Sequence, residues 1–150
     1  MTSTPAACTL QSNLAEAARI MWERDCGIVP ITEGGKVIGV VTDRDICIAA
    51  STKNRSPSQI GVGELPRGDA IVCRQDEDVH TALRLMRERH IRRRPVIGPD
   101  DQLAGVVSIN DLVIAAGEKR DVRPGEVLDA LKAICSHPAR QAPATKAASA

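Results

Sequence analysis

With 150 residues, 43% of them hydrophobic, the chain is long enough for one compact domain or for two small modules that share a core. That core must be aliphatic, because the sequence contains one Trp and neither Phe nor Tyr. The net charge of +1 excludes a strong overall attraction to nucleic acid or membrane, and no apolar run reaches the roughly 18 residues of a membrane span. The N-terminus lacks the basic start and apolar stretch of a signal peptide, so we expect a cytoplasmic protein.

The first half of the chain predicts a strand, a helix, two strands and a helix. Residues 1–7 are expected to be disordered and residues 7–10 to form a short strand. Asn13 and Glu16 have the spacing of a capping box, and an apolar helical face follows over residues 14–21. A strand over residues 28–32 contains Pro30, a Gly-Gly turn leads into a returning strand over residues 37–41, and a helix runs through residues 46–50.

The same order recurs after a polar linker at residues 51–58. Strands are predicted over residues 70–73, around Pro95 and over residues 103–107, with helices over residues 79–90 and 110–116. Each unit therefore reads β-α-β-β-α. Beyond the repeat, residues 118–135 contain a short amphipathic helix, and residues 136–150 have the Ala/Pro/Ser/Lys composition of a disordered tail.

The strongest signal is a stretch that occurs twice. Residues 39–46 read GVVTDRDI, and sixty-six positions later residues 105–112 read GVVSINDL. Each copy is an apolar strand that ends in a hydroxyl residue, with a carboxylate three residues further on. Backbone N–H groups are unpaired where such a strand meets a helix, which favours anions, although either Asp alone would pass for a plain N-terminal cap.

These residues resemble a tandem pair of cystathionine-β-synthase (CBS) domains, the arrangement called a Bateman module, and in particular small bacterial CBS-pair proteins of the hypoxic-response type. The resemblance covers residues 7–117 and departs from the family in lacking a helix before the first strand. It implies an α+β fold of two β-α-β-β-α modules packed about a pseudo-twofold axis. We predict a first module over residues 7–58, a second over 59–117, a C-terminal helical segment over 118–135 and a tail over 136–150.

The resemblance also implies two clefts that bind AMP, ADP, ATP or S-adenosylmethionine as regulatory ligands, with no cofactor required. In the family the carboxylate of the repeated motif accepts from the ribose hydroxyls, and the hydroxyl residue faces the phosphates. The opposite module lends its Pro strand to sandwich the base. The implied ligand-binding residues are Thr42, Arg44, Asp45, Arg93, Pro95, Ser108, Asn110, Asp111, Ile28 and Pro30.

The two clefts are expected to be unequal. The first combines Thr42, Arg44 and Asp45 with Arg93 of the opposite module. In the second, Asp111 faces Ile28, which takes the place of Arg93 and brings no cation. We therefore expect the first cleft to bind phosphate more tightly.

Other functions have weaker support. His80, His90 and His137 lack partners at the spacing of a catalytic triad or metal site, so we expect no enzyme. The five cysteines form no C-x-x-C pair, which favours packing over redox or metal sensing. The Arg-rich stretch at residues 84–94 is interspersed with acids and lacks aromatics, which argues against nucleic acid. A ligand-free interaction scaffold is the alternative, and Trp22 is either a core-edge residue or an anchor in the expected homodimer.

Overall fold

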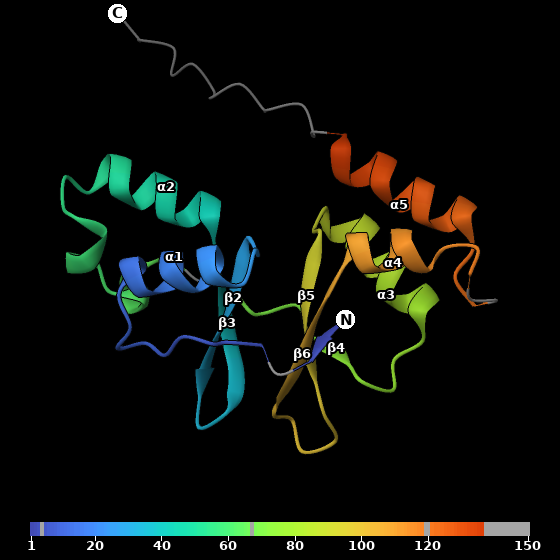
Figure 1. Cartoon of the computed structure of the whole chain (residues 1–150), viewed down its shortest axis with the longest axis horizontal. Coiled ribbons are helices and arrows are strands. Elements are labelled where there is room, and N and C mark those ends of the chain that lie inside the picture. Colours follow the sequence, from blue (N-terminus) through green and yellow to red (C-terminus); the bar gives the residue numbers. More distant parts are fainter. Residues whose placement is uncertain (4, 67, 119–120, 137–150) are drawn as a thin grey trace, which may run out of the picture.

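A computed structural model describes residues 1–3, 5–66, 68–118 and 121–136. Within these residues the chain forms five α-helices, two single 3-10 turns and two small sheets, which confirms the α+β prediction. Figure 1 shows the two halves of the chain side by side, with the strand hairpins in the middle and the helices above them. The predicted disorder of residues 137–150 lies outside the described residues.

The first unit is a β-hairpin covered by two helices. Strand β2 (Ile28–Glu33) pairs antiparallel with β3 (Lys36–Thr42), and α1 (Leu14–Glu23) and α2 (Asp43–Thr52) flank them. The predicted turn is confirmed, because Gly34 and Gly35 have φ of 55° and 83°, where other residues are strained. The predicted capping box at Asn13 is also present. After α2, short 3-10 turns at Pro57–Gln59 and Val62–Glu64 lead into the second unit.

The second unit repeats this plan and adds one helix. Its sheet contains β4 (Cys73–Arg74), β5 (Arg93–Ile97) and β6 (Leu103–Ser108), and its helices are α3 (Val79–Arg89), α4 (Ile109–Ala115) and α5 (Pro124–Cys135). The two units match in register as well as in order. Cys8 forms a parallel bridge to Ile31, and Cys73 pairs in parallel with Val96, so both pairs are shifted by the same sixty-five positions.

Two expected strands are shorter than predicted, and one strand was not predicted. Cys8 makes a single bridge, and β4 covers two residues where four were expected, because each of these segments pairs with only one neighbouring strand. The expectation of disorder at the N-terminus is wrong for β1 (Thr2–Ser3), which pairs antiparallel with β6. The N-terminal segment therefore completes the sheet of the second unit before the chain crosses to the first.

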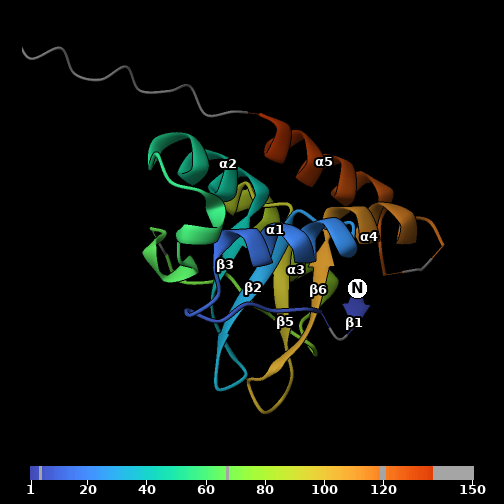
Figure 2. The same cartoon turned by 60° about the vertical axis from the view of Figure 1, so that its left-hand side comes forward.

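The units have separate apolar cores. One core contains Leu14, Val29 and Val41, and the other contains Met86, Leu112 and Ile134 of three different helices. The hairpin turns touch at an isolated bridge between Lys36 and Gln102, where the Leu103 N–H donates to the Gly35 carbonyl at 3.1 Å. Figure 2 shows the two hairpins beside each other, with α5 along the outside of the second unit.

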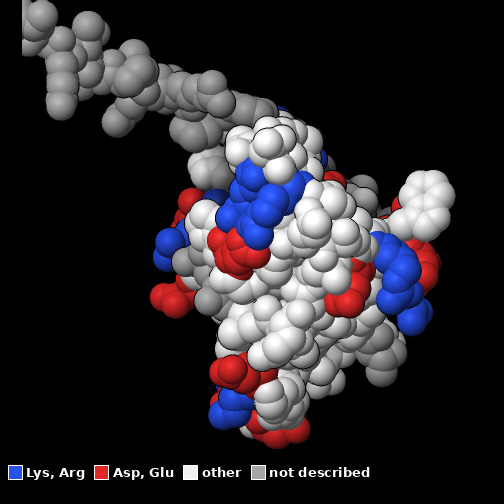
Figure 3. All heavy atoms as spheres, turned by 90° about the vertical axis from the view of Figure 1, so that its left-hand side faces the viewer, with Lys and Arg blue, Asp and Glu red and all other residues white. Residues whose placement is uncertain are grey.

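Hydropathy of the helices and charge on one face of the surface can both be described. Among the described residues, none of the helices combines the length and hydropathy needed to cross a bilayer. Figure 3 shows the face of the first unit, where basic and acidic side chains occur in small mixed groups with uncharged surface between them. This face therefore has no extended patch of one sign.

Candidate functional site

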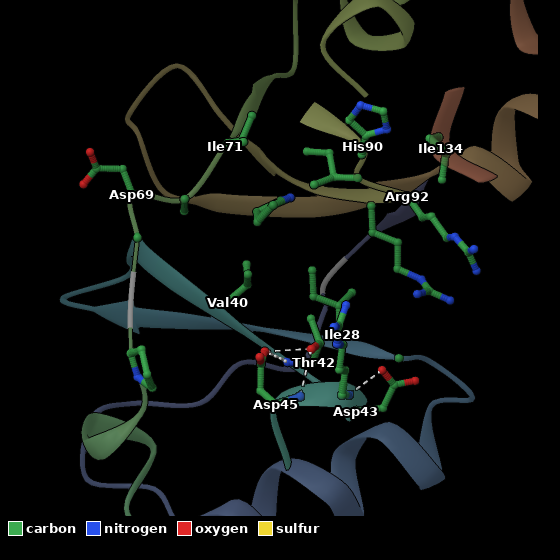
Figure 4. A pocket seen from close by; sticks show the side chains of 18 of the residues that line it. Ile28, Val40, Thr42, Asp43, Asp45, Asp69, Ile71, His90, Arg92 and Ile134 are labelled. Carbon is green, nitrogen blue, oxygen red and sulfur yellow. Dashed lines mark hydrogen bonds between the residues drawn. The ribbon is translucent and has the colours of Figure 1, made fainter. Parts of the chain in front are cut away.

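A cavity of about 740 Å³ lies between the two units. Its volume falls within the range of small-molecule sites, roughly 300–1,000 Å³. Side chains from both hairpins, from the segment before β4 and from the end of α5 line it (Figure 4). Of the predicted site residues, those that line this cavity are Ile28, Thr42, Arg44, Asp45, Arg93 and Pro95.

The floor of the cavity is the junction between β3 and α2, where Thr42 and Asp45 form a capping box. The Asp45 Oδ2 atom accepts from the Thr42 backbone N–H at 2.9 Å and from the Thr42 hydroxyl at 2.7 Å. The Thr42 Oγ1 atom in turn accepts from the Asp45 N–H at 3.2 Å. The structure gives Asp45 Oδ1 no hydrogen bond within the described chain, so this oxygen retains its acceptor capacity toward the cavity.

The walls differ in chemistry from one side to the other. In the view of Figure 4, Val40 and Ile71 lie on one side with Asp69 beyond them, and Arg92, His90 and Ile134 lie on the other. Arg93 and Arg44 also line the cavity. Val40 and Ile71 therefore present aliphatic surface suited to a base, whereas Arg92 on the other side brings a cation suited to phosphate.

A buried ion pair holds the apolar wall in place. Arg94 is 1% exposed, and its Nη1 donates to Glu77 Oε1 at 2.6 Å. The same guanidinium donates to the carbonyls of Ile71 and Val72, in the segment that brings Ala70 and Ile71 to the cavity. Arg93 and Arg94 thus point to opposite sides of β5, one into the cavity and one behind its wall.

The junction between β6 and α4 in the second unit has the same hydrogen bonds, but its carboxylate also lies beside the Met1 amine. Asp111 Oδ2 accepts from the Ser108 N–H at 2.8 Å and from the Ser108 hydroxyl at 2.7 Å, as in the first unit. Its Oδ1 lies 3.1 Å from the amine of Met1. Burial raises the pKa of Asp111, but the hydrogen bonds from Ser108 and the Met1 amine outweigh it, so the pKa lies below its usual value.

The other residues predicted for the second cleft lie in different places. Ile28 pairs with Thr42 across the first hairpin and lines the first cavity. Pro30 is fully buried within β2, where it pairs with Val40. Asn110 is exposed on the first turn of α4, outside the first cavity. The first cavity therefore brings together the first predicted group and Ile28, and the second cleft stays a prediction.

Several lining residues were missed from the sequence because they come from outside the repeated motif. His90 ends α3 with φ of 52°, lines the cavity and contacts α5 through Nδ1, 2.7 Å from the Ala133 carbonyl. Ile134 and Ser136 of the α5 end also line it, although Ser136 was expected to begin the tail. The positive run at residues 92–94 was the sequence signal for Arg92, whereas no spacing indicated where α5 docks.

The described residues hold little chemistry of other kinds. They contain no group of three or more His, Cys, Asp or Glu side chains placed to hold a metal ion. His80 contacts Glu126 at 2.5 Å, but this pair joins α3 to α5 away from the cavity. Burial, reinforced by the hydrogen bond to Glu77, raises the pKa of the Cys73 thiol to about 11, which leaves it protonated and weakly nucleophilic at neutral pH.

Comparison with known proteins agrees with this geometry. The family model for the CBS domain matches residues 1–51 and 62–118. Hypoxic response protein 1 of Mycobacterium tuberculosis is 32% identical over 124 residues, which cover 82% of each chain. The CBS domain protein PAE2072 from Pyrobaculum aerophilum, solved with AMP, has a TM-score of 0.69 at 21% identity, covering 88% of this chain and 95% of its own. The CBS domain pair of MJ0100, solved with 5-methylthioadenosine and S-adenosyl-L-methionine, has a TM-score of 0.63 at 25% identity, covering 79% and 94%.

Proposed function

The chain belongs to the CBS domain family, of which it carries two copies, and we propose that it is a sensor of an adenine nucleotide or related adenosyl compound. The ligand occupies the cavity between the two units, and its binding is regulatory, with no chemical step. The observation that carries the proposal is the cavity itself, where the unengaged Oδ1 of Asp45 shares the lining with Arg92 and Arg93.

Each part of an adenine nucleotide finds suitable chemistry in this cavity. A carboxylate oxygen accepts from a ribose diol, the guanidinium groups of Arg92 and Arg93 donate to phosphate, and aliphatic side chains cover a base. AMP in PAE2072 and the two adenosyl compounds in MJ0100 support this ligand class. On the face of the first unit that Figure 3 shows, the mixed charges offer no extended basic surface for nucleic acid.

The two clefts are proposed to be unequal, with the first dominant. Asp111 is already engaged by Ser108 and by the Met1 amine, whereas Asp45 is engaged only by its own cap. A ligand at the second carboxylate must displace that amine or share the oxygen with it. The first cleft also gains the cations that the second was expected to lack.

Thermal shift against AMP, ADP, ATP, S-adenosylmethionine and NADH tests the proposal, because a ligand that binds the folded state raises its melting temperature. Calorimetric titration of the best ligand then compares Asp45→Ala and Arg93→Ala with Asp111→Ala. A charge-assisted contact contributes about 1.5–3 kcal/mol to the binding free energy. Each of the first two variants loses such a contact and should therefore bind the ligand roughly tenfold or more weakly.

Two results would count against the proposal. If no compound in the panel raises the melting temperature at millimolar concentration, the alternative of a ligand-free interaction scaffold takes precedence. If Asp111→Ala abolishes tight binding while Asp45→Ala and Arg93→Ala retain it, the dominant site is the second cleft and the assignment of the first is wrong.

A further inference from the structure

A second cavity of about 490 Å³ lies against the first. Three residues line both cavities, namely Gly27, Asp43 and Arg93. The others that line the second come from the end of α1 and the loop after it, and they are Met21, Trp22, Asp25 and Cys26. The two cavities are therefore neighbours, and these three residues form the boundary that they share.

At that boundary, two charged side chains come close to the backbone of Gly27, because glycine has no side chain. A Cβ atom at Gly27 would lie 2.9 Å from Asp43 Oδ2 and 3.2 Å from Arg93 Nη1, closer than side chains tolerate. The missing methyl group thus lets a carboxylate and a guanidinium approach the same point from α2 and β5. Arg93 is the one cation that both linings share, so an anionic group at the boundary would contact it from either cavity.

Trp22 is the sole aromatic residue of the chain, and it stands at the second cavity. Its side chain is 88% exposed, which is unusual for the residue with the largest apolar surface. The buried Met21 and the half-buried Cys26 line the same cavity beside it. An exposed indole is a stacking surface for a planar ring, and the sequence contains no other Trp and neither Phe nor Tyr.

We infer that the second cavity is a subsite for a second ring, joined to the nucleotide in the first cavity through its phosphates. The ligand class is a dinucleotide, in which two nucleosides are linked by a pyrophosphate. One nucleoside occupies the first cavity, the pyrophosphate crosses the boundary at Arg93, and the second base stacks on Trp22. This inference rests on the proposed nucleotide site and extends it.

The single tryptophan provides a direct readout, because it is the only strong fluorophore in the protein. Titrations compare NAD⁺, ADP-ribose, which lacks the second base, and AMP. NAD⁺ should quench Trp22 fluorescence saturably, whereas ADP-ribose and AMP should bind, by calorimetry, without quenching it. Stacking of one base should make NAD⁺ bind about tenfold more tightly than ADP-ribose.

Trp22→Leu should lower the affinity for NAD⁺ to that for ADP-ribose and leave the affinity for AMP unchanged. Leu128→Ala is the matched control, because Leu128 is also an exposed apolar residue, 51% exposed, and lies in neither cavity lining. It should leave all three affinities unchanged. Circular dichroism checks that both variants keep the fold.

The outcomes separate the subsite from the nucleotide site. Equal affinities for NAD⁺ and ADP-ribose, with no change in Trp22 fluorescence, would overturn the subsite while the nucleotide site stands. If none of the three compounds binds, the proposed function itself fails. If Trp22→Leu changes the sedimentation coefficient and no nucleotide affinity, Trp22 is a contact between copies of the chain and the inference is wrong.

Discussion

Arg94 is the only charged side chain among the described residues that is fully buried, and its single carboxylate partner is Glu77. Removal of one member of such a pair strands the other charge in an apolar environment. We expect Arg94→Met to lower the free energy of unfolding by about 3–5 kcal/mol, measured by denaturant titration.

The matched control for Arg94 is Arg84→Met, which removes an exposed i,i+4 pair with Glu88 on α3. Such pairs contribute about 0.5 kcal/mol or less. The double variant Arg94→Met/Glu77→Gln should recover part of the lost stability, because it also removes the stranded carboxylate. Equal effects of Arg94→Met and Arg84→Met would contradict the role of Arg94 behind the cavity wall.

The lowered pKa of Asp111 predicts that the free energy of unfolding depends on pH. Its pKa in the folded protein lies below the unfolded value of about 3.9, because of Ser108 and the Met1 amine. The carboxylate therefore stabilises the fold above about pH 4, and this contribution is lost as the pH falls through the lowered pKa. The stability difference between the native protein and Asp111→Asn should be larger at pH 7 than at pH 3. A difference that stays constant over this range would show that Asp111 is not linked to folding.

At the scale of the element, α5 extends the repeat and takes part in both the second core and the cavity. Ile134 is 7% exposed and packs in that core, while Leu128 on the same helix is 51% exposed. We expect Ile134→Ala to lower the free energy of unfolding by about 2–5 kcal/mol and Leu128→Ala by less than about 0.5 kcal/mol. Thermal denaturation of both variants measures this, and a small effect of Ile134→Ala would mean that α5 is only loosely docked.

The elements that could be predicted from the sequence are those with local and repeated signals. The capping boxes at Asn13, Thr42 and Ser108 depend on residues three positions apart, so spacing alone indicates them. The Gly34-Gly35 turn likewise depends on one local backbone requirement. The box at Asn13 and the Gly34-Gly35 turn were predicted, and the structure contains both. At the repeated motif Asp45 and Asp111 were considered as caps, whereas the structure makes Thr42 and Ser108 the N-caps and places the two Asp residues at the third helical position.

The elements that were missed depend on contacts far along the chain. Strand β1 is two residues long and forms only because β6 offers an open edge. The burial of Arg94 follows from Glu77 and two distant carbonyls, and the alternation along β5 is its only local signal. The place of α5 is decided by its contacts with α3 and α4, which no periodicity within α5 identifies. Within the site, the repeat therefore indicated the Asp45 floor and left the α5 side unassigned.

At the scale of the whole molecule, one pair of exposed apolar residues follows the repeat. Ile48 on α2 and Ile114 on α4 are sixty-six positions apart, occupy equivalent places in the two units, and are 50% and 73% exposed. Paired apolar surfaces of this kind suit a symmetric contact between two copies of the chain. We therefore propose that the protein forms a homodimer through α2 and α4.

Sedimentation at micromolar concentration tests the dimer. Ile48→Glu/Ile114→Glu should convert a dimer into a species of 16.0 kDa, because it places carboxylates in the contact. Leu128→Glu, on the exposed side of α5, is the control and should leave the mass unchanged. A native protein that sediments only at 16.0 kDa would exclude the homodimer at that concentration.

The pairing of β1 with β6 also has a kinetic consequence. Thr2 and Val106 lie more than a hundred residues apart in sequence. Strand β1 is synthesised first, but it can pair only after β6, the last strand, has been synthesised. A pairing over this sequence separation raises the contact order of the second unit's sheet, which slows its completion. The two halves resemble each other closely, yet only the first contains all the strands of its own sheet. A fragment that begins at the second unit should therefore lack the β1 edge strand, and refolding of the whole chain should end in a slow step in which β1 pairs with β6.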